Sequence, residues 1–178
     1  VVSMLPMFYV DMFGLDKVTA GMLAGSYAFI NLVARPMGGL ISDKFGRKIT
    51  LLIVFVGIGV SFMMLGQVNQ EWSVLMVIGA ATLGGIFSKA GSGAVYAMVP
   101  LIQRRLTGQI AGMAGAFGNV GGVVFLTVLA TTNPQIFFMT IGGAALLVLA
   151  FVAFFLREPG GVMTEVLPDG TVQMIELK

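Results

Sequence analysis

The 178-residue sequence contains neither cysteine nor histidine. The absence of cysteine excludes disulfide bonds and thiolate chemistry, and the absence of histidine excludes imidazole metal sites and a histidine proton relay. Charge is also scarce, because only 10% of the residues are Asp, Glu, Lys or Arg. Hydrophobic residues make up 57% of the chain, and the mean hydropathy is +0.98. A soluble domain of this size would not bury so much apolar surface, so the composition predicts an all-α integral membrane protein.

Long apolar runs divide the chain into membrane spans, since a spanning helix needs about 20 mostly apolar residues. Residues 1–157 form the predicted transmembrane region, and residues 158–178 form a tail of different character. Val1 lies inside an apolar run without a signal-peptide pattern, so we expect a fragment that begins within a span. The spans are predicted at residues 1–13 (partial), 18–41, 49–67, 73–99, 109–131 and 135–156.

Basic residues outside the spans fall on alternating connections. The connections at 42–48 and 100–108 and the start of the tail carry them, whereas the opposite side has only Lys17. Basic loops stay in the cytoplasm, so we expect a multi-pass protein of the cell (inner or plasma) membrane with a cytoplasmic C-terminus. The residues concerned are Lys44, Arg47, Lys48, Arg104, Arg105 and Arg157.

The tail alternates apolar and polar residues on both sides of a turn signal. The two alternating segments are residues 162–167 and 171–177, and Pro168-Asp169-Gly170 lies between them. This pattern predicts a short β-hairpin. The alternative is a partly ordered tail, because a lone hairpin is marginally stable in water.

The connection after the second span has a distinctive pattern of glycine and charge. Gly39 allows close packing near the end of the preceding helix, Asp43 can pair locally, and Gly46 allows a tight turn. The basic residues hold the connection at the cytoplasmic face. The alternative is an ordinary positive-inside loop. The pattern G-x-x-x-D-K-x-G-R-K consists of Gly39, Asp43, Lys44, Gly46, Arg47 and Lys48.

The fifth span is rich in glycine, although each glycine costs about 1 kcal/mol of helix stability relative to alanine. Most of these glycines recur at steps of three and four residues and therefore share one broad helix face. Small residues let helix backbones approach closely in lipid, so we interpret them as a helix-packing signature rather than as ligands. The signature consists of Gly112, Gly115, Gly118, Gly121 and Gly122.

Taken together, these motifs resemble a known family. The pattern at 39–48 is similar to the cytoplasmic-loop motif of the major facilitator superfamily. The run from Ala111 to Gly122 resembles the nitrate signature of its nitrate/nitrite porter family, and residues 34–36 and 100–105 are similar to that family too. The tail is similar to the cyanobacterial nitrate permease branch. The resemblance implies the C-terminal six-helix half of a transporter, with its first helix truncated.

Two cations lie well inside the predicted spans, Arg35 and Lys89. An ionised side chain near the centre of a span costs about 2.5–3.5 kcal/mol on insertion scales. Asp11 is the nearest carboxylate, but it lies toward the outer end of the truncated span. The partner of these cations is therefore expected to be a residue of an absent half or an anionic substrate.

Arg35 shares a helix face with Tyr27 and Asn31, at spacings of four and eight residues. Pro36 cannot donate to the carbonyl of Leu32, which loosens the helix beside this face. A planar guanidinium matches a planar oxyanion such as nitrate through two parallel hydrogen bonds. In the family resemblance Arg35 matches the second-half arginine that binds the anion. The alternative is that Arg35 snorkels to the cytoplasmic surface.

Two further polar residues complete the predicted substrate site. Lys89 shares a face with Gly85, Ser92 and Tyr96. It either contacts the anion directly, or pairs with another charge or tunes the electric field along the path of the anion. Asn119 offers a two-sided amide within the glycine run and is a candidate anion contact. Its alternative role is an interhelical hydrogen bond, which is worth about 0.6 kcal/mol on average.

The resemblance implies secondary active transport of nitrate or nitrite by alternating access, with uptake coupled to protons. Electroneutral nitrate/nitrite exchange, transport of another small anion, and a non-transporting interaction subunit are the alternatives. The expected partners are nitrate or nitrite, the coupling proton, the lipid bilayer and a missing N-terminal six-helix half, with no nucleic acid. The sequence holds no nucleophile–base pair or metal cluster, so we expect no enzyme, catalytic residue, metal or cofactor.

Overall fold

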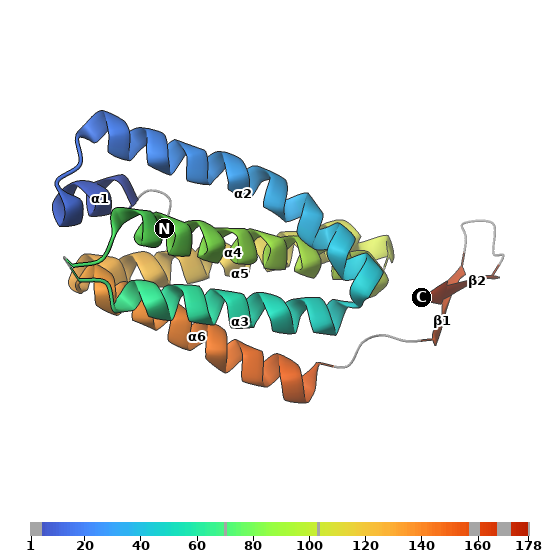
Figure 1. The fold of residues 1–178 in the computed structure, drawn as a ribbon. Coiled ribbons are helices and arrows are strands. Elements are labelled where there is room, and N and C mark those ends of the chain that lie inside the picture. The colour runs from blue at the N-terminus through green and yellow to red at the C-terminus, as the bar shows by residue number, and fades with distance from the viewer. Residues whose placement is uncertain (1–4, 70, 103, 157–160, 167–171, 178) are drawn as a thin grey trace.

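The computed structural model describes residues 5–69, 71–102, 104–156, 161–166 and 172–177. Its long helices run alternately up and down the bundle (Figure 1). Each predicted span corresponds to one helix, and α2 and α4 extend furthest beyond their predicted ends. The helices are α1 (Leu5–Phe13), α2 (Lys17–Phe45), α3 (Arg47–Gly66), α4 (Val74–Ile102), α5 (Thr107–Thr131) and α6 (Pro134–Phe155), with a short 3-10 turn at Arg104–Leu106.

The predicted connection at 42–48 is wrong in its length, because α2 and α3 continue through most of it. Gly46 is the one residue between them, with φ +94° and ψ 143°. Residues with a Cβ rarely adopt this backbone conformation, so glycine permits the direct turn. Asp43 accepts a hydrogen bond from Arg47 across the turn, with 3.3 Å between Oδ1 and Nη2. The charged residues of the motif therefore lie on helix ends rather than on a loose loop.

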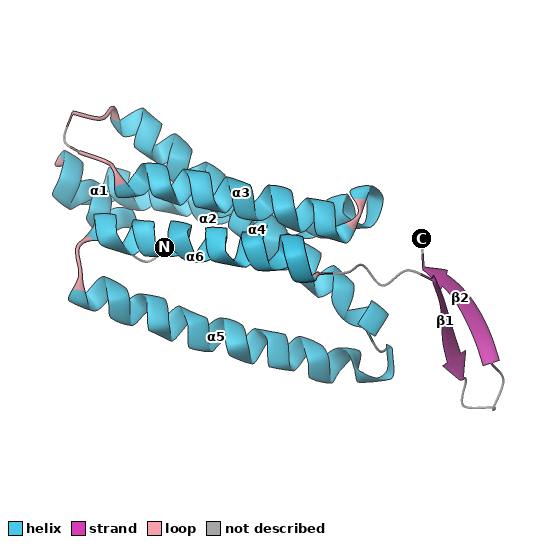
Figure 2. Ribbon diagram, turned by 90° about the horizontal axis from the view of Figure 1, so that it is seen from below, coloured by secondary structure: helices cyan, strands magenta, loops and turns pink. Residues whose placement is uncertain are grey.

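The helices do not pack equally. α2 packs along α4, α4 along α3, and α3 along α6, whereas α5 contacts α4 and α6 far less (Figure 2). No described residue of α5 is fully buried within this chain. α5 is therefore held at one side of the bundle, with most of its surface open.

The main core lies toward the end of the bundle that holds α1. Phe138 of α6 is completely buried there, and its ring centroid lies 5.5 Å from that of Phe8 in α1 and 6.0 Å from that of Phe62 in α3. The aromatic contacts tie three helices together. On the same α3–α6 interface, a methyl group on Gly142 would stand 3.3 Å from the carbonyl oxygen of Gly59, so the two backbones are close.

By length and composition, the described helices α3, α4, α5 and α6 can each cross a membrane. α2 has 29 residues but is more polar than these four and falls outside that group. The full span predicted at 18–41 therefore stays a prediction. α2 nevertheless continues as a helix through Pro36.

The predicted hairpin is confirmed. β1 (Gly161–Val166) pairs antiparallel with β2 (Val172–Leu177), with Val166 opposite Val172 next to the turn. The predicted turn residues Pro168, Asp169 and Gly170 lie outside the described residues.

Candidate functional site

The candidate site is built where α2 and α4 come into backbone contact. A methyl group on Gly93 would overlap the carbonyl oxygen of Arg35, and one on Gly38 would overlap the backbone of Ala90. Gly39, the predicted packing glycine, has more room, since its methyl group would lie 3.6 Å from the Gly93 carbonyl oxygen. The close contact between the helices fixes the backbone of Arg35 against α4.

The side chain of Arg35 extends from this contact and is exposed. Its guanidinium carbon lies 4.8 Å from the centroid of the Tyr96 ring, which is a cation–π contact between α2 and α4. Among the described residues, Arg47 forms an ion pair with Asp43, but no carboxylate lies within 4.0 Å of Arg35. The Arg35 guanidinium therefore retains its capacity to bind an anion.

The two helix faces predicted from spacing meet each other. Tyr27 is buried, at 6% exposure, with its ring against Gly85 of α4. Arg35 lies two turns further along α2 and meets Tyr96 of α4, because α2 and α4 run in the same direction (Figure 1). Lys89 lies on α4 between these two contacts, and its side chain is exposed.

Not every predicted site residue is brought into this group. Asn31 lies on α2 between Tyr27 and Arg35, but its side chain is outside the described residues. Asn119 is exposed on α5. The spacing along α4 indicated the face that holds Tyr96, but nothing in the sequence indicated its contact with Arg35.

The glycines of α5 differ in their surroundings. A methyl group on Gly115 would lie 3.3 Å from the hydroxyl oxygen of Tyr96, so here α5 approaches α4 closely. The other four glycines of the predicted signature have no atom of the described chain within 4 Å of an added methyl group. Their packing role stays a prediction. These four are Gly112, Gly118, Gly121 and Gly122.

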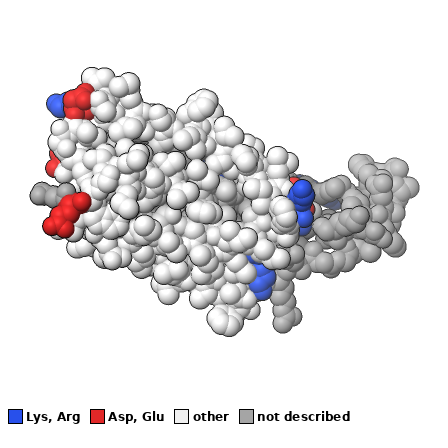
Figure 3. All heavy atoms as spheres, viewed as in Figure 1, with Lys and Arg blue, Asp and Glu red and all other residues white. Residues whose placement is uncertain are grey.

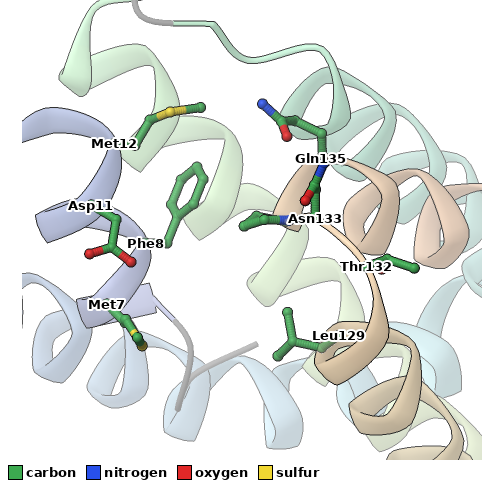
Figure 4. Close-up of a pocket in the computed structure, with 9 residues that line it drawn as sticks. Met7, Phe8, Asp11, Met12, Leu129, Thr132, Asn133 and Gln135 are labelled. Atoms are coloured by element: carbon green, nitrogen blue, oxygen red, sulfur yellow. The ribbon is translucent and has the colours of Figure 1, made fainter.

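A cavity of about 530 Å³ lies at the α1 end of the bundle (Figure 4). Asp11 and Met12 of α1 line one side, and Asn133 and Gln135 at the start of α6 line the other. None of the predicted substrate residues lines it. Asp11, the carboxylate considered as a partner for Arg35 and Lys89, therefore belongs to this separate end of the molecule.

Charge is also separated along the bundle. Lys and Arg side chains gather mostly at the end where α2 meets α3, and Asp and Glu side chains gather mostly at the opposite end (Figure 3). Between the two ends the visible surface is almost free of charge. Such an uncharged band with charged ends fits a bundle immersed in a bilayer.

Comparisons with known proteins agree with the fold. The family model described as Major Facilitator Superfamily matches residues 1–175. No solved structure matches the chain. The chain spans about a third of the length of the curated relatives that it matches first, at 32% and 34%.

Several relatives are named as nitrate transporters. A "Nitrate/nitrite transporter NrtP" of Nostoc punctiforme is 52% identical over 161 residues, which is 90% of this chain and 32% of that protein. The protein of the same name from Picosynechococcus sp. is 44% identical over 183 residues, covering 93% of this chain and 34% of the relative. "High affinity nitrate transporter 2.7" of Arabidopsis thaliana is 34% identical over 124 residues, covering 66% and 24%. The chain is thus a multi-pass membrane protein that belongs to the major facilitator superfamily, and its resemblance to the nitrate/nitrite porters, including the cyanobacterial branch, is confirmed.

Proposed function

We propose that this chain forms part of a secondary transporter that carries nitrate or nitrite by alternating access. Its relatives are named nitrate and nitrite transporters, which supports this choice of substrate. In this proposal the chain is the C-terminal six-helix half, and an N-terminal half encloses the substrate site from the other side. Lys89, Asn119, Tyr27 and Asn31 are the remaining proposed site residues.

The observation that carries the proposal is the guanidinium of Arg35. It projects from a backbone held against α4, it is exposed, and within the described residues no carboxylate lies within 4.0 Å of it. Insertion of such a charge in a membrane is costly unless it has a partner. A planar monovalent oxyanion supplies the missing negative charge and fits the fork of N–H donors.

The test is a substitution that keeps the charge of Arg35 but removes its fork. In the full-length protein, Arg35→Lys is expected to lower nitrate uptake at sub-saturating concentration at least tenfold, since a lysine cannot form the paired hydrogen bonds. Arg105→Lys is the matched control, because Arg105 is exposed in the short turn before α5. Normal nitrate uptake by Arg35→Lys would rule out the proposed site.

We propose proton-coupled uptake as the mode of transport. Bringing one negative charge into a cell at −100 mV costs about 2.3 kcal/mol, so entry of the anion needs a coupled cation or an exchanged anion. Electroneutral exchange is the second candidate, because the predicted spans from 18 to 156 contain Arg35 and Lys89 but no Asp, Glu or His. Vesicles with an acidic exterior distinguish the two: a proton gradient drives uptake by a symporter, whereas an exchanger needs nitrite inside.

In the proposed orientation, the end of the bundle where α2 meets α3 lies on the cytoplasmic side of the cell membrane. The basic residues at this end support it through the positive-inside rule. The C-terminal end of α6 lies at the same end of the bundle, so the hairpin would also be cytoplasmic (Figure 1). Protease treatment of sealed, right-side-out cells should then leave the tail intact.

A further inference from the structure

Tyr96 contacts two different helices from its position on α4. Its ring lies beneath the guanidinium of Arg35 on α2, with 4.8 Å from the guanidinium carbon to the ring centroid. Its hydroxyl oxygen lies on the α5 side, 3.3 Å from the position that a methyl group on Gly115 would occupy. Tyr96 is half-buried, so its ring is itself held by the surrounding helices.

The contact with Tyr96 matters because the backbone of Arg35 is held by packing against α4, whereas that packing does not hold its guanidinium. Gly93 sets the position of the Arg35 carbonyl and hence of the helix. The long side chain beyond it is exposed and has several rotatable bonds, which cost free energy when they are ordered by a ligand. The Tyr96 ring restricts these bonds in advance and leaves the N–H donors at the guanidinium edge available for an anion.

The contact with α5 depends on the absence of a side chain at position 115. A distance of 3.3 Å between a methyl carbon and the hydroxyl oxygen is tighter than an ordinary contact of 3.5–4.0 Å. An alanine at 115 would push the hydroxyl group away, and the ring would move with it. Since the same ring lies against Arg35, a change on α5 is transmitted to the guanidinium on α2.

We propose that Tyr96 is a positioning residue for anion recognition, which holds the Arg35 guanidinium through its ring and requires Gly115 for the place of its hydroxyl. This inference rests on the proposed role of Arg35 in binding the anion. It assigns Gly115 a role that the other glycines of the run do not share, because their added methyl groups would meet no described atom.

The ring is tested by initial rates of nitrate uptake in the full-length protein, normalised to the amount in the membrane. Tyr96→Leu removes the aromatic face and is expected to raise the half-saturating nitrate concentration about 3- to 30-fold, with little change in maximal rate. Tyr96→Phe keeps the face and should stay within about twofold of the parent protein. Equal values for Tyr96→Leu and the parent, or equal weakening by Phe and Leu, would overturn the positioning role.

The contact with α5 is tested by a rescue. Gly115→Ala should raise the half-saturating concentration, and combining it with Tyr96→Phe should restore it, because the missing hydroxyl makes room for the methyl group. Failure of Tyr96→Phe to rescue would refute the coupling between α5 and Arg35. If Arg35→Lys weakens uptake while Tyr96→Leu does not, the proposed function stands and this inference fails. An Arg35→Lys protein with normal uptake would remove the basis of both.

Discussion

The backbone contact between α2 and α4 can be tested by adding one methyl group to it. In Gly93→Ala the new Cβ would overlap the carbonyl oxygen of Arg35, which is part of a helix and cannot rotate away. The two helices would have to separate by roughly 1.5 Å or more to restore an ordinary carbon–oxygen contact. Gly79→Ala is the matched control, because Gly79 also lies in α4 and its added methyl group would meet no described atom within 4 Å.

The cost of the overlap is the difference in the free energy of unfolding between Gly93→Ala and Gly79→Ala. Both replace a helical glycine by alanine, so both gain about 1 kcal/mol of helix propensity, and this gain cancels. Overpacking a close contact costs about 1–3 kcal/mol, so Gly93→Ala should be less stable than Gly79→Ala by that amount. This corresponds to roughly a 5- to 150-fold change in the unfolding equilibrium constant.

The assay is reversible unfolding of the full-length protein in mixed micelles, with rising mole fractions of sodium dodecyl sulfate and helical circular dichroism as the signal. The measurement requires no assumption about the transported substrate. Equal unfolding midpoints for the two variants would refute the close approach of α2 and α4 at Arg35. A lower midpoint for Gly79→Ala would show that the tight contact lies on another face of α4.

Two further substitutions test the ends of α2. Gly46→Ala should destabilise the protein by about 1–3 kcal/mol, because its φ of +94° is strained for alanine, whereas Gly25→Ala should not; the same unfolding assay compares them. Asp16 caps the start of α2, and hydrogen bonds from the side chain and backbone of Thr19 lower its pKa below the usual 3.8. A lowered folded pKa means that this stabilisation is present above about pH 3.8 and is lost as the pH falls below it toward the folded value. Asp16→Asn, which still caps but does not titrate, should remove this pH dependence, and an unchanged pH profile of the unfolding midpoint would contradict the role of the carboxylate.

The order of the helices could be predicted from the sequence because lipid demands long apolar runs with internal hydrogen bonds. The residues at which the helices end were harder to predict from the sequence. Lys44 and Arg47 were expected in a connection, but a helix continues readily beyond the bilayer into water, and Gly46 alone makes the turn. Hydropathy reports where the membrane ends, whereas hydrogen bonding decides where the helix ends.

The candidate site could be predicted in part. Periodicity placed Tyr27 and Arg35 on one face of α2 and Gly85 and Tyr96 on one face of α4, and contacts of the structure join these two faces. Which residues touch across the interface depends on the depth and rotation of each helix, and one sequence does not contain that information. The glycine-rich run of α5 therefore attracted attention, whereas the tight contact at Gly93 is visible only in three dimensions.

The packing of α6 on α3 has a consequence for folding during synthesis. Helices emerge in chain order, so α3 can pack against α4 before its other partner, α6, has been synthesised. Until then the surface around Gly59 and Phe62 has no α6 to cover it, and Phe138 has not yet arrived to join the aromatic core. α6 thus completes the interface with α3, and a chain truncated before α6 would leave this face of α3 uncovered in the lipid.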